Sequence, residues 1–231
     1  RRIDEYREQR RGGVGKAGAS VKEEDLIQNL YVLSSHSQLL CFTTKGKVFW
    51  LKVYEIPVAS RTSKGRPLVN MLKLDDDETV TQILPVEEFS EDKFIFMATR
   101  NGVVKKTNLN LFHKKYKSGI KAIRLDDDDK LVGTVITDGD NDILLSSYSG
   151  KLIRFHESKV RPMGRTARGV KGITLKDGMK VISLIVGDPS KTILCLSENG
   201  FGKRTKLEDF PSYNRGGQGV IALKTSERNG N

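Results

Sequence analysis

The sequence predicts an all-β, propeller-like fold built from four tandem repeats of about 50 residues. A turn recurs with its glycine spaced by 56, 48 and 50 residues, at Gly46, Gly102, Gly150 and Gly200. A second glycine follows each turn at spacings of 54, 50 and 50 residues, at Gly65, Gly119, Gly169 and Gly219. Short apolar segments flank both glycines, and four strands in about 50 residues are typical of propeller blades.

Each repeat is expected to form one four-stranded blade. The first strand precedes the turn, at 39–42, 95–98, 143–146 and 193–196. The return strand follows the turn, at 48–53, 103–107 and 152–155. A third strand follows the second glycine, at 120–125, 170–175 and 220–224, and the last strand lies at 80–84, 131–135 and 181–185. The pairs Asn101-Gly102 and Asn199-Gly200 predict type I′ turns, in which both central residues have positive φ.

We expect residues 1–231 to form a single domain, with an N-terminal arm over 1–27 and repeats at approximately 28–79, 80–130, 131–179 and 180–231. A β-sandwich or barrel is the alternative, although neither fold requires a repeat. The chain is long enough for a sizeable core. It has no apolar run near the ~20 residues of a membrane span, and no secretory signal is expected at residues 1–4. A secreted mini-protein, a membrane protein and a disordered tail are therefore disfavoured.

The two cysteines are expected to be buried apolar side chains. Cys41 and Cys195 each lie five residues before the turn glycine, where the other repeats have Met97 and Leu145. A position that accepts Cys, Met and Leu is an apolar position. We therefore expect neither a redox role nor a metal for these cysteines, and two cysteines form no disulfide framework.

The net charge of +11, from 40 Lys and Arg against 29 Asp and Glu, suggests a polyanionic partner. Four equivalent segments, here called the rim loops, precede the second glycines at 60–66, 113–119, 161–169 and 211–219. They contain no acid and ten basic residues: Arg61, Lys64, Arg66, Lys114, Lys115, Lys117, Arg161, Arg165, Arg168 and Arg215. Acids occur instead at 75–78, 126–129, Asp177 and Glu227, which predicts a basic rim and a more acidic opposite side.

The rim loops favour duplex DNA bound through its backbone, and solvated, charged turns are the alternative. Lys105-Lys106 and the segment 203–206, which includes Lys203 and Arg204, are candidates to extend the basic track. Only Tyr116 and Tyr213 lie in the loops, which is too few for stacking on single strands. Neutralising about eight phosphates would give a slope near −7 for log affinity against log salt.

A second candidate site precedes the first repeat, in a stretch without acids from residue 9 to residue 22. Its residues are Gln9, Arg10, Arg11, Gly12, Gly13, Val14, Gly15 and Lys16. Glycines let backbone approach a phosphate closely, while paired guanidinium groups hold it bidentately. A flexible linker with incidental charge is the alternative interpretation.

This segment resembles the Q-R-R-G-G-K-G box of the C-terminal domains of DNA gyrase A proteins, and further similar stretches lie at 22–25, 48–52, 59–62, 96–100 and 163–169. The resemblance covers essentially the whole chain. It implies a β-pinwheel, a propeller variant whose blades exchange strands. It further implies wrapping of duplex DNA around the rim, presentation of that DNA to the gyrase core for ATP-dependent negative supercoiling, and essential box arginines. The implied partners are duplex DNA, the remainder of the gyrase A protein and the gyrase B protein, in the bacterial cytoplasm.

Two features depart from the family. Val14 stands where the box has Lys, with Lys16 close by, and four repeats are visible where the family usually has six. Two other functions stay open: the related C-terminal domain of topoisomerase IV, against which the box argues, and a propeller scaffold for acidic protein partners.

The sequence predicts no catalysis by this chain alone. The three histidines, His36, His113 and His156, fall at unrelated positions in their repeats, and no nucleotide-binding glycine loop is present. The acidic run at 126–129 lacks the glycine and terminal Glu of a calcium loop, so we expect no metal site. No cofactor is expected in this chain, and ATP and Mg²⁺ would be used by other parts of the parent enzyme.

Overall fold

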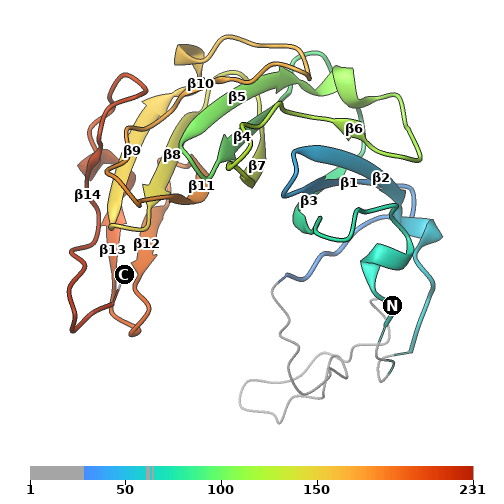
Figure 1. Ribbon diagram of the computed structural model, residues 1–231, viewed down its shortest axis with the longest axis horizontal. Helices are drawn as coiled ribbons and strands as arrows, with labels where there is room; N and C mark the ends of the chain where they lie inside the picture. The colour runs from blue at the N-terminus through green and yellow to red at the C-terminus, as the bar shows by residue number, and fades with distance from the viewer. Residues whose placement is uncertain (1–28, 61–62, 64, 231) are drawn as a thin grey trace.

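The computed structural model describes residues 29–60, 63 and 65–230, which form antiparallel β-sheets that follow one another around an arc (Figure 1). Three sheets have four strands and the last has two, which confirms the all-β class. The described helices are short 3-10 turns: η2 (Val53–Glu55), η3 (Leu68–Asn70), η4 (Leu109–Phe112), η5 (Glu157–Lys159) and η6 (Leu207–Asp209). None of them is long and apolar enough to cross a membrane.

Every four-stranded sheet has the same order, from an inner strand through a hairpin to an outer strand. The first sheet contains β3 (Val80–Val86), β1 (Gln38–Thr43), β2 (Lys47–Lys52) and β6 (Ile120–Lys121). The second contains β7 (Leu131–Thr137), β4 (Phe94–Thr99), β5 (Val103–Asn108) and β10 (Val170–Lys171). The third contains β11 (Val181–Gly187), β8 (Asp142–Ser147), β9 (Lys151–His156) and β14 (Val220–Ile221). The fourth pairs β12 (Thr192–Leu196) with β13 (Gly202–Lys206).

Neighbouring repeats exchange strands. The hairpin β1–β2 comes from the first repeat, whereas its partners β3 and β6 belong to the second. The inner strand β7 lies against both β3 and β11 on the inside of the arc, and the outer strands line its convex side (Figure 1). For the hairpin β12–β13, no described residue supplies an inner or outer strand.

Two local predictions were wrong. Gly102 has φ +85°, and its N–H donates to Thr99 O at 3.0 Å. Among the described residues only glycines have a positive φ, so Asn101 does not have the positive φ that a type I′ turn requires. The turn is therefore a type I turn followed by a left-handed glycine, and not type I′. The strands predicted at 120–125, 170–175 and 220–224 contain only two residues each, because the next two N–H groups donate to a glycine carbonyl, as those of Gly172 and Ile173 do to Gly102 O.

The core lies between adjacent sheets and buries both faces of the hairpins. Alternate residues of β4 point to different sides: Ile95 and Met97 pack toward the first sheet, whereas Phe96 and Ala98 pack toward the third. Cys41 is fully buried as predicted, and burial raises the pKa of its thiol to about 12. Cys195 is half-buried, because its two-stranded sheet covers it less.

Candidate nucleic-acid interface

The rim loops 113–119, 161–169 and 211–219 run along the outer side of the arc and join neighbouring sheets. The loop 161–169 begins after η5 of the third sheet and ends at β10 of the second. On the way, Met163 N–H donates to Lys106 O at 2.8 Å. The loop 211–219 repeats this path one sheet later, where Tyr213 N–H donates to Arg154 O at 2.8 Å. Both of these loops therefore lie over the return strand of the preceding sheet.

The second glycines Gly169 and Gly219 are needed because their loops approach these strands closely. Gly169 has φ +99°, and a Cβ there would lie 2.4 Å from Val104 O. Gly219 has φ +69°, and a Cβ there would lie 2.4 Å from Leu152 O. Only glycine combines a left-handed backbone with such an approach without strain. In these two loops, the glycine spacing that identified the repeat marks the point where the loop meets the strand of the preceding sheet, whereas a Cβ at Gly65 would have open space around it.

In the loop 113–119, Lys114, Lys115 and Lys117 are all exposed. Tyr116 between them packs against Trp50, with 6.3 Å between ring centroids. Partial burial, and then the positive charge of Lys52, lowers the pKa of Lys115. The aromatic contact holds the loop in place while its three ammonium groups remain available to an anion.

In the loop 161–169, Arg161 and Arg168 are exposed and Arg165 is half-buried. The Arg168 guanidinium forms a bidentate ion pair with Asp126, with Nε 2.8 Å from Oδ1, and this pairing lowers the pKa of the carboxyl. Within the described ranges, no carboxylate lies at ion-pair distance from Arg161 or Arg165. Arg168 would have to exchange its carboxylate for a phosphate in order to bind DNA.

Lys105 and Lys106 do not extend the basic track, because the loop 161–169 covers both. Lys105 is fully buried, and its Nζ donates to the carbonyl oxygens of Ala122 (2.6 Å), Gly164 (2.8 Å) and Arg165 (2.5 Å). Burial, and then the charge of Arg165, lowers the pKa of Lys105 to about 7. Lys106 Nζ lies 3.3 Å from a carboxylate oxygen of the fully buried Glu157. The prediction that this pair contacts DNA was wrong.

The remaining candidates differ in exposure. Lys203 and Arg204 are exposed, because no described loop covers β13 as the rim loops cover β5 and β9. Arg215 is half-buried and donates to Lys159 O at 3.0 Å and Lys171 O at 3.1 Å, so it ties its loop to the neighbouring one. Arg66 is exposed. Outside the described residues lie Arg61, Lys64 and the candidates between residues 9 and 16.

Two basic residues of the rim were not predicted from the sequence. Lys121 and Lys171 are the second residues of the outer strands β6 and β10, and both are exposed. The signal that could have found them is the Gly-Ile-Lys and Gly-Val-Lys pattern at the second glycine. These segments were predicted to be half-buried strands, in which every second residue faces solvent. A lysine at such a position therefore gave no indication of a DNA contact.

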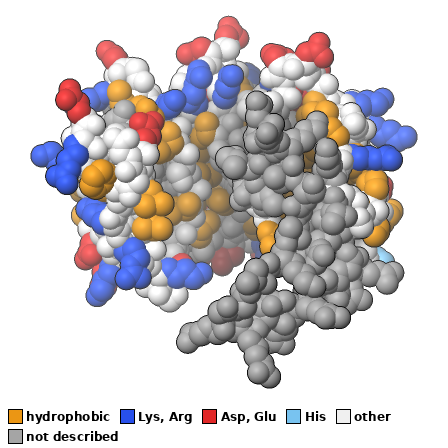
Figure 2. Space-filling view, turned by 90° about the horizontal axis from the view of Figure 1, so that it is seen from below, with side chains coloured by type: hydrophobic (Ala, Val, Ile, Leu, Met, Phe, Trp, Pro, Cys, Tyr) orange, Lys and Arg blue, Asp and Glu red, His pale blue; other side chains and the backbone are white. Residues whose placement is uncertain are grey.

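The acidic connections do not form a separate, opposite side. Asp75 and Asp77 pair with Lys45 and Lys47 at the hairpin turn of the first sheet, and Asp126 reaches the rim through Arg168. Acidic groups gather along one edge of the molecule with lysine and arginine directly beside them (Figure 2). The expected segregation of charge is therefore incomplete. In the described part of the chain, no three His, Cys, Asp or Glu side chains come together as metal ligands.

Comparison with known proteins agrees with this arrangement. The family described as "DNA gyrase C-terminal domain, beta-propeller" matches residues 2–34, 37–87, 93–138, 141–188 and 191–230. The DNA gyrase A protein of Salmonella typhimurium is 47% identical over 228 residues, and that of Escherichia coli K12 is 48% identical over 228; each alignment covers 99% of this chain and 26% of the relative. The chain thus spans about a quarter of these relatives.

Two solved structures share the fold. The crystal structure of the C-terminal domain of DNA topoisomerase IV superimposes with a TM-score of 0.76 at 31% identity, over 84% of this chain and 61% of the other. The DNA gyrase A C-terminal domain superimposes with a TM-score of 0.74 at 22% identity, over 99% of this chain and 74% of the other. The propeller-like architecture predicted from the repeats is confirmed.

Proposed function

The chain belongs to the family of DNA gyrase C-terminal domains, the non-catalytic part of a type II topoisomerase, and from that premise we propose that it wraps duplex DNA around its basic rim. The wrapped segment is presented to the gyrase core for ATP-dependent negative supercoiling. The remainder of the gyrase A protein and the gyrase B protein are the proposed protein partners, and ATP and Mg²⁺ act in those other parts. The proposed location is the bacterial cytoplasm.

One observation carries this proposal: equivalent, acid-free loops present exposed cations along the convex side of the arc. Lys114 and Lys117 lie on one loop and Arg161 on the next, with Lys121 and Lys171 on the strands that follow. A regular row of cations matches the regular row of phosphates on a duplex and reads no base sequence. Bending 20–30 bp of DNA by 40–90° costs on the order of 1–6 kcal/mol, which repeated phosphate contacts offset.

The salt dependence of duplex binding tests the rim. Fluorescence anisotropy with duplexes of increasing length, between 50 and 200 mM salt, is expected to give a slope near −7, and the double variant Lys114→Gln/Lys117→Gln is expected to make it shallower by about 2. The matched control Lys93→Gln/Lys191→Gln removes two exposed lysines from connections that precede a hairpin. An equal change in the control would show that net charge, and not the rim, governs binding. Affinity that stops rising beyond about 20 bp would count against wrapping.

Wrapping itself is tested by the linking number of plasmid DNA closed in the presence of the protein. The proposal expects a positive linking-number change, and Arg10→Ala/Arg11→Ala is expected to abolish it while rim binding persists. An unchanged linking number with the parent protein would refute wrapping. Retained wrapping in the variant would refute the proposed role of the box.

A second candidate is the DNA-binding role of a topoisomerase IV C-terminal domain, without strong chiral wrapping. The fold match to that domain, at 31% identity, favours it. It predicts the same salt slope but no linking-number change, so the plasmid experiment separates the two functions. A scaffold for acidic proteins would instead show no dependence on duplex length.

A further inference from the structure

The hairpin-turn end of the first three sheets carries a small site whose charged residues differ from sheet to sheet. In the first sheet, the buried Glu78 carboxylate accepts a hydrogen bond from the Thr43 hydroxyl. Lys47 Nζ lies 2.9 Å from Asp75 and 3.5 Å from Glu78. The turn thus holds an internal carboxylate and a lysine that neutralises it.

The second sheet keeps the carboxylate at the equivalent position. Asp129 is buried and its Oδ1 accepts from Asn101 N–H at 2.9 Å. The equivalence follows from the backbone, because the residue after each carboxylate accepts from the turn in the same way. These bonds are Thr44 N–H to Thr79 O, Arg100 N–H to Lys130 O and, in the third sheet, Tyr148 N–H to Lys180 O.

In the third sheet, the two positions aligned with these acids hold residues that are not acidic. Met179 occupies the position of Glu78 and Asp129, and Lys176 occupies the position of Asp75 and Asp126. Lys151 stands where the first sheet has Lys47. The turn therefore has Lys151 and Lys176 and neither carboxylate, whereas the first sheet has two carboxylates together with Lys47 and a second lysine, Lys45, at the position of Ser149.

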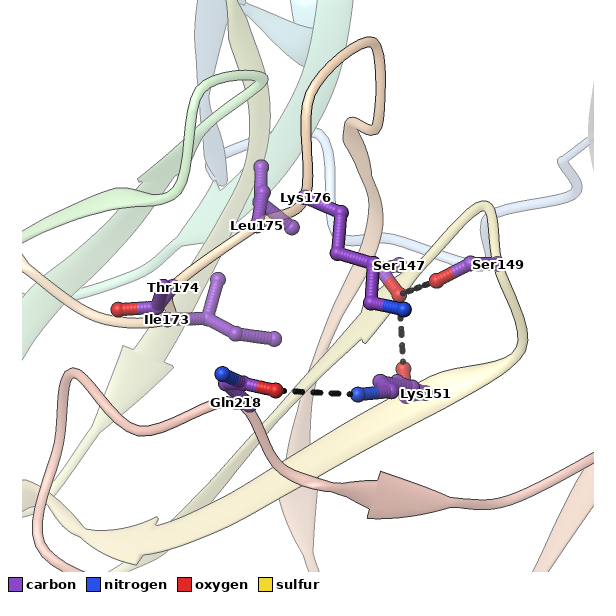
Figure 3. Close-up of a pocket in the computed structure, with 8 residues that line it drawn as sticks. All are labelled: Ser147, Ser149, Lys151, Ile173, Thr174, Leu175, Lys176 and Gln218. Atoms are coloured by element: carbon purple, nitrogen blue, oxygen red, sulfur yellow. Dashed lines mark hydrogen bonds between the residues drawn. The ribbon is translucent and has the colours of Figure 1, made fainter.

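A pocket of about 30 Å³ lies at this turn, with room for about two water-sized spheres. Lys176 extends toward the Ser147 and Ser149 hydroxyls, whereas the Lys151 ammonium group points toward Gln218 (Figure 3). The two hydroxyl oxygens are 3.0 Å apart, and Lys151 Nζ lies 3.4 Å from Gln218 Oε1. None of the described residues that line the pocket is acidic, so the lining supplies two lysines and no carboxylate to neutralise them.

We propose that this pocket binds a phosphate group in place of the carboxylate that the neighbouring sheets carry. The Ser147 hydroxyl already donates to Lys151 O at 3.3 Å, so the lysines supply the charged donors of this pocket. A phosphate can accept from both ammonium groups at once, through charge-assisted hydrogen bonds. The phosphate comes either from the backbone of bound DNA or from a free anion.

Titration with inorganic phosphate, followed by amide NMR shifts at constant ionic strength with chloride, tests the pocket without DNA. Saturable shifts are expected at Ser147, Ser149 and Lys151, with at least a tenfold loss of affinity in Lys176→Gln. The double variant Lys176→Asp/Met179→Glu restores the acids of the first sheet, and it should keep the fold and lose phosphate binding. The control Lys180→Gln removes an exposed lysine from the same connection and should bind phosphate normally.

Unsaturable shifts, or an equal loss of affinity in Lys180→Gln, would overturn the proposal. Duplex binding by the double variant identifies the source of the phosphate. If Lys176→Asp/Met179→Glu also makes the salt slope of duplex binding shallower by about 1, the phosphate belongs to DNA, and if duplex binding is unchanged, the ligand is a free anion. Failure of duplex binding in the parent protein would refute the proposed function and leave the inorganic phosphate result standing.

Discussion

Replacing Lys105 by Met tests whether a buried ammonium group holds the rim loop 161–169. The side chain is fully buried, and its Nζ lies within hydrogen-bond distance of four backbone carbonyl oxygens, three of them in that loop. Phe49 and Ile153 occupy the equivalent positions of the neighbouring sheets, so an apolar side chain is compatible with the fold. The substitution therefore removes the charge and keeps the volume of the core.

We expect the free energy of unfolding of the wild-type protein to show a pH dependence that Lys105→Met lacks. The pKa of Lys105 is lowered from 10.5 to about 7 in the folded protein, mainly by burial. The unfolded chain then binds more protons between these two pH values, so the free energy of unfolding rises with pH across this window. Between pH 7.5 and 9, wild type gains about 2 kcal/mol relative to Lys105→Met. This is an upper limit, because the carbonyl acceptors favour the ammonium form and oppose the shift.

Urea denaturation of both proteins at several pH values gives the difference directly. Lys203→Met serves as the control, because it removes the lysine from the equivalent but exposed position of the fourth sheet. Plotted against pH, the free energy of unfolding of Lys203→Met should run parallel to that of wild type. Parallel curves for Lys105→Met as well would show that Lys105 stays charged throughout the window, and the assigned pKa would be wrong.

Three substitutions and one thiol reagent probe the rest of the fold. Glu157→Ala should lower the free energy of unfolding by about 3–5 kcal/mol, measured in urea, because it leaves the buried ammonium of Lys106 without its carboxylate. Gly200→Ala should cost about 1–2 kcal/mol for its left-handed backbone alone, and Gly150→Ala should cost more, because its Cβ would lie 2.0 Å from a carbonyl oxygen. A thiol reagent at pH 8 should label the half-buried Cys195 in the native protein, and Cys41, whose thiol pKa is about 12, only after unfolding; the ratio of the two labelling rates is the measurement.

The hairpins could be predicted from the sequence because local features define them. A left-handed glycine such as Gly102 fixes the turn, and the apolar runs on either side fix the strands. Strand exchange left no local signal, since the partner of β2 is a two-residue strand some 70 positions later in the chain. The burial of Lys105 and Lys106 also escaped prediction, because it depends on a loop from the following repeat, and a Lys-Lys pair on a strand has the same sequence whether it is covered or exposed.

The position four residues after the turn glycine shows how this exchange holds the rim. It is occupied by Trp50, Lys106 and Arg154, which differ in charge and shape but all donate to carbonyl oxygens at the 3-10 helix of the next repeat. The bonds are Trp50 Nε1 to Phe112 O (2.8 Å), Lys106 Nζ to Glu157 O (3.2 Å) and Arg154 Nη1 to Leu207 O (2.9 Å).

The repeat therefore retains a hydrogen-bond donor at this position and not a particular residue type. Because each donor is anchored in one sheet and its acceptor lies just before the rim loop of the next, each of these three loops is held by two consecutive repeats. A phosphate bound by one loop consequently pulls on the sheet before it as well as on its own. Strand exchange thus couples neighbouring sheets at the surface where the proposed DNA contacts lie, and a single repeat would not position its own loop.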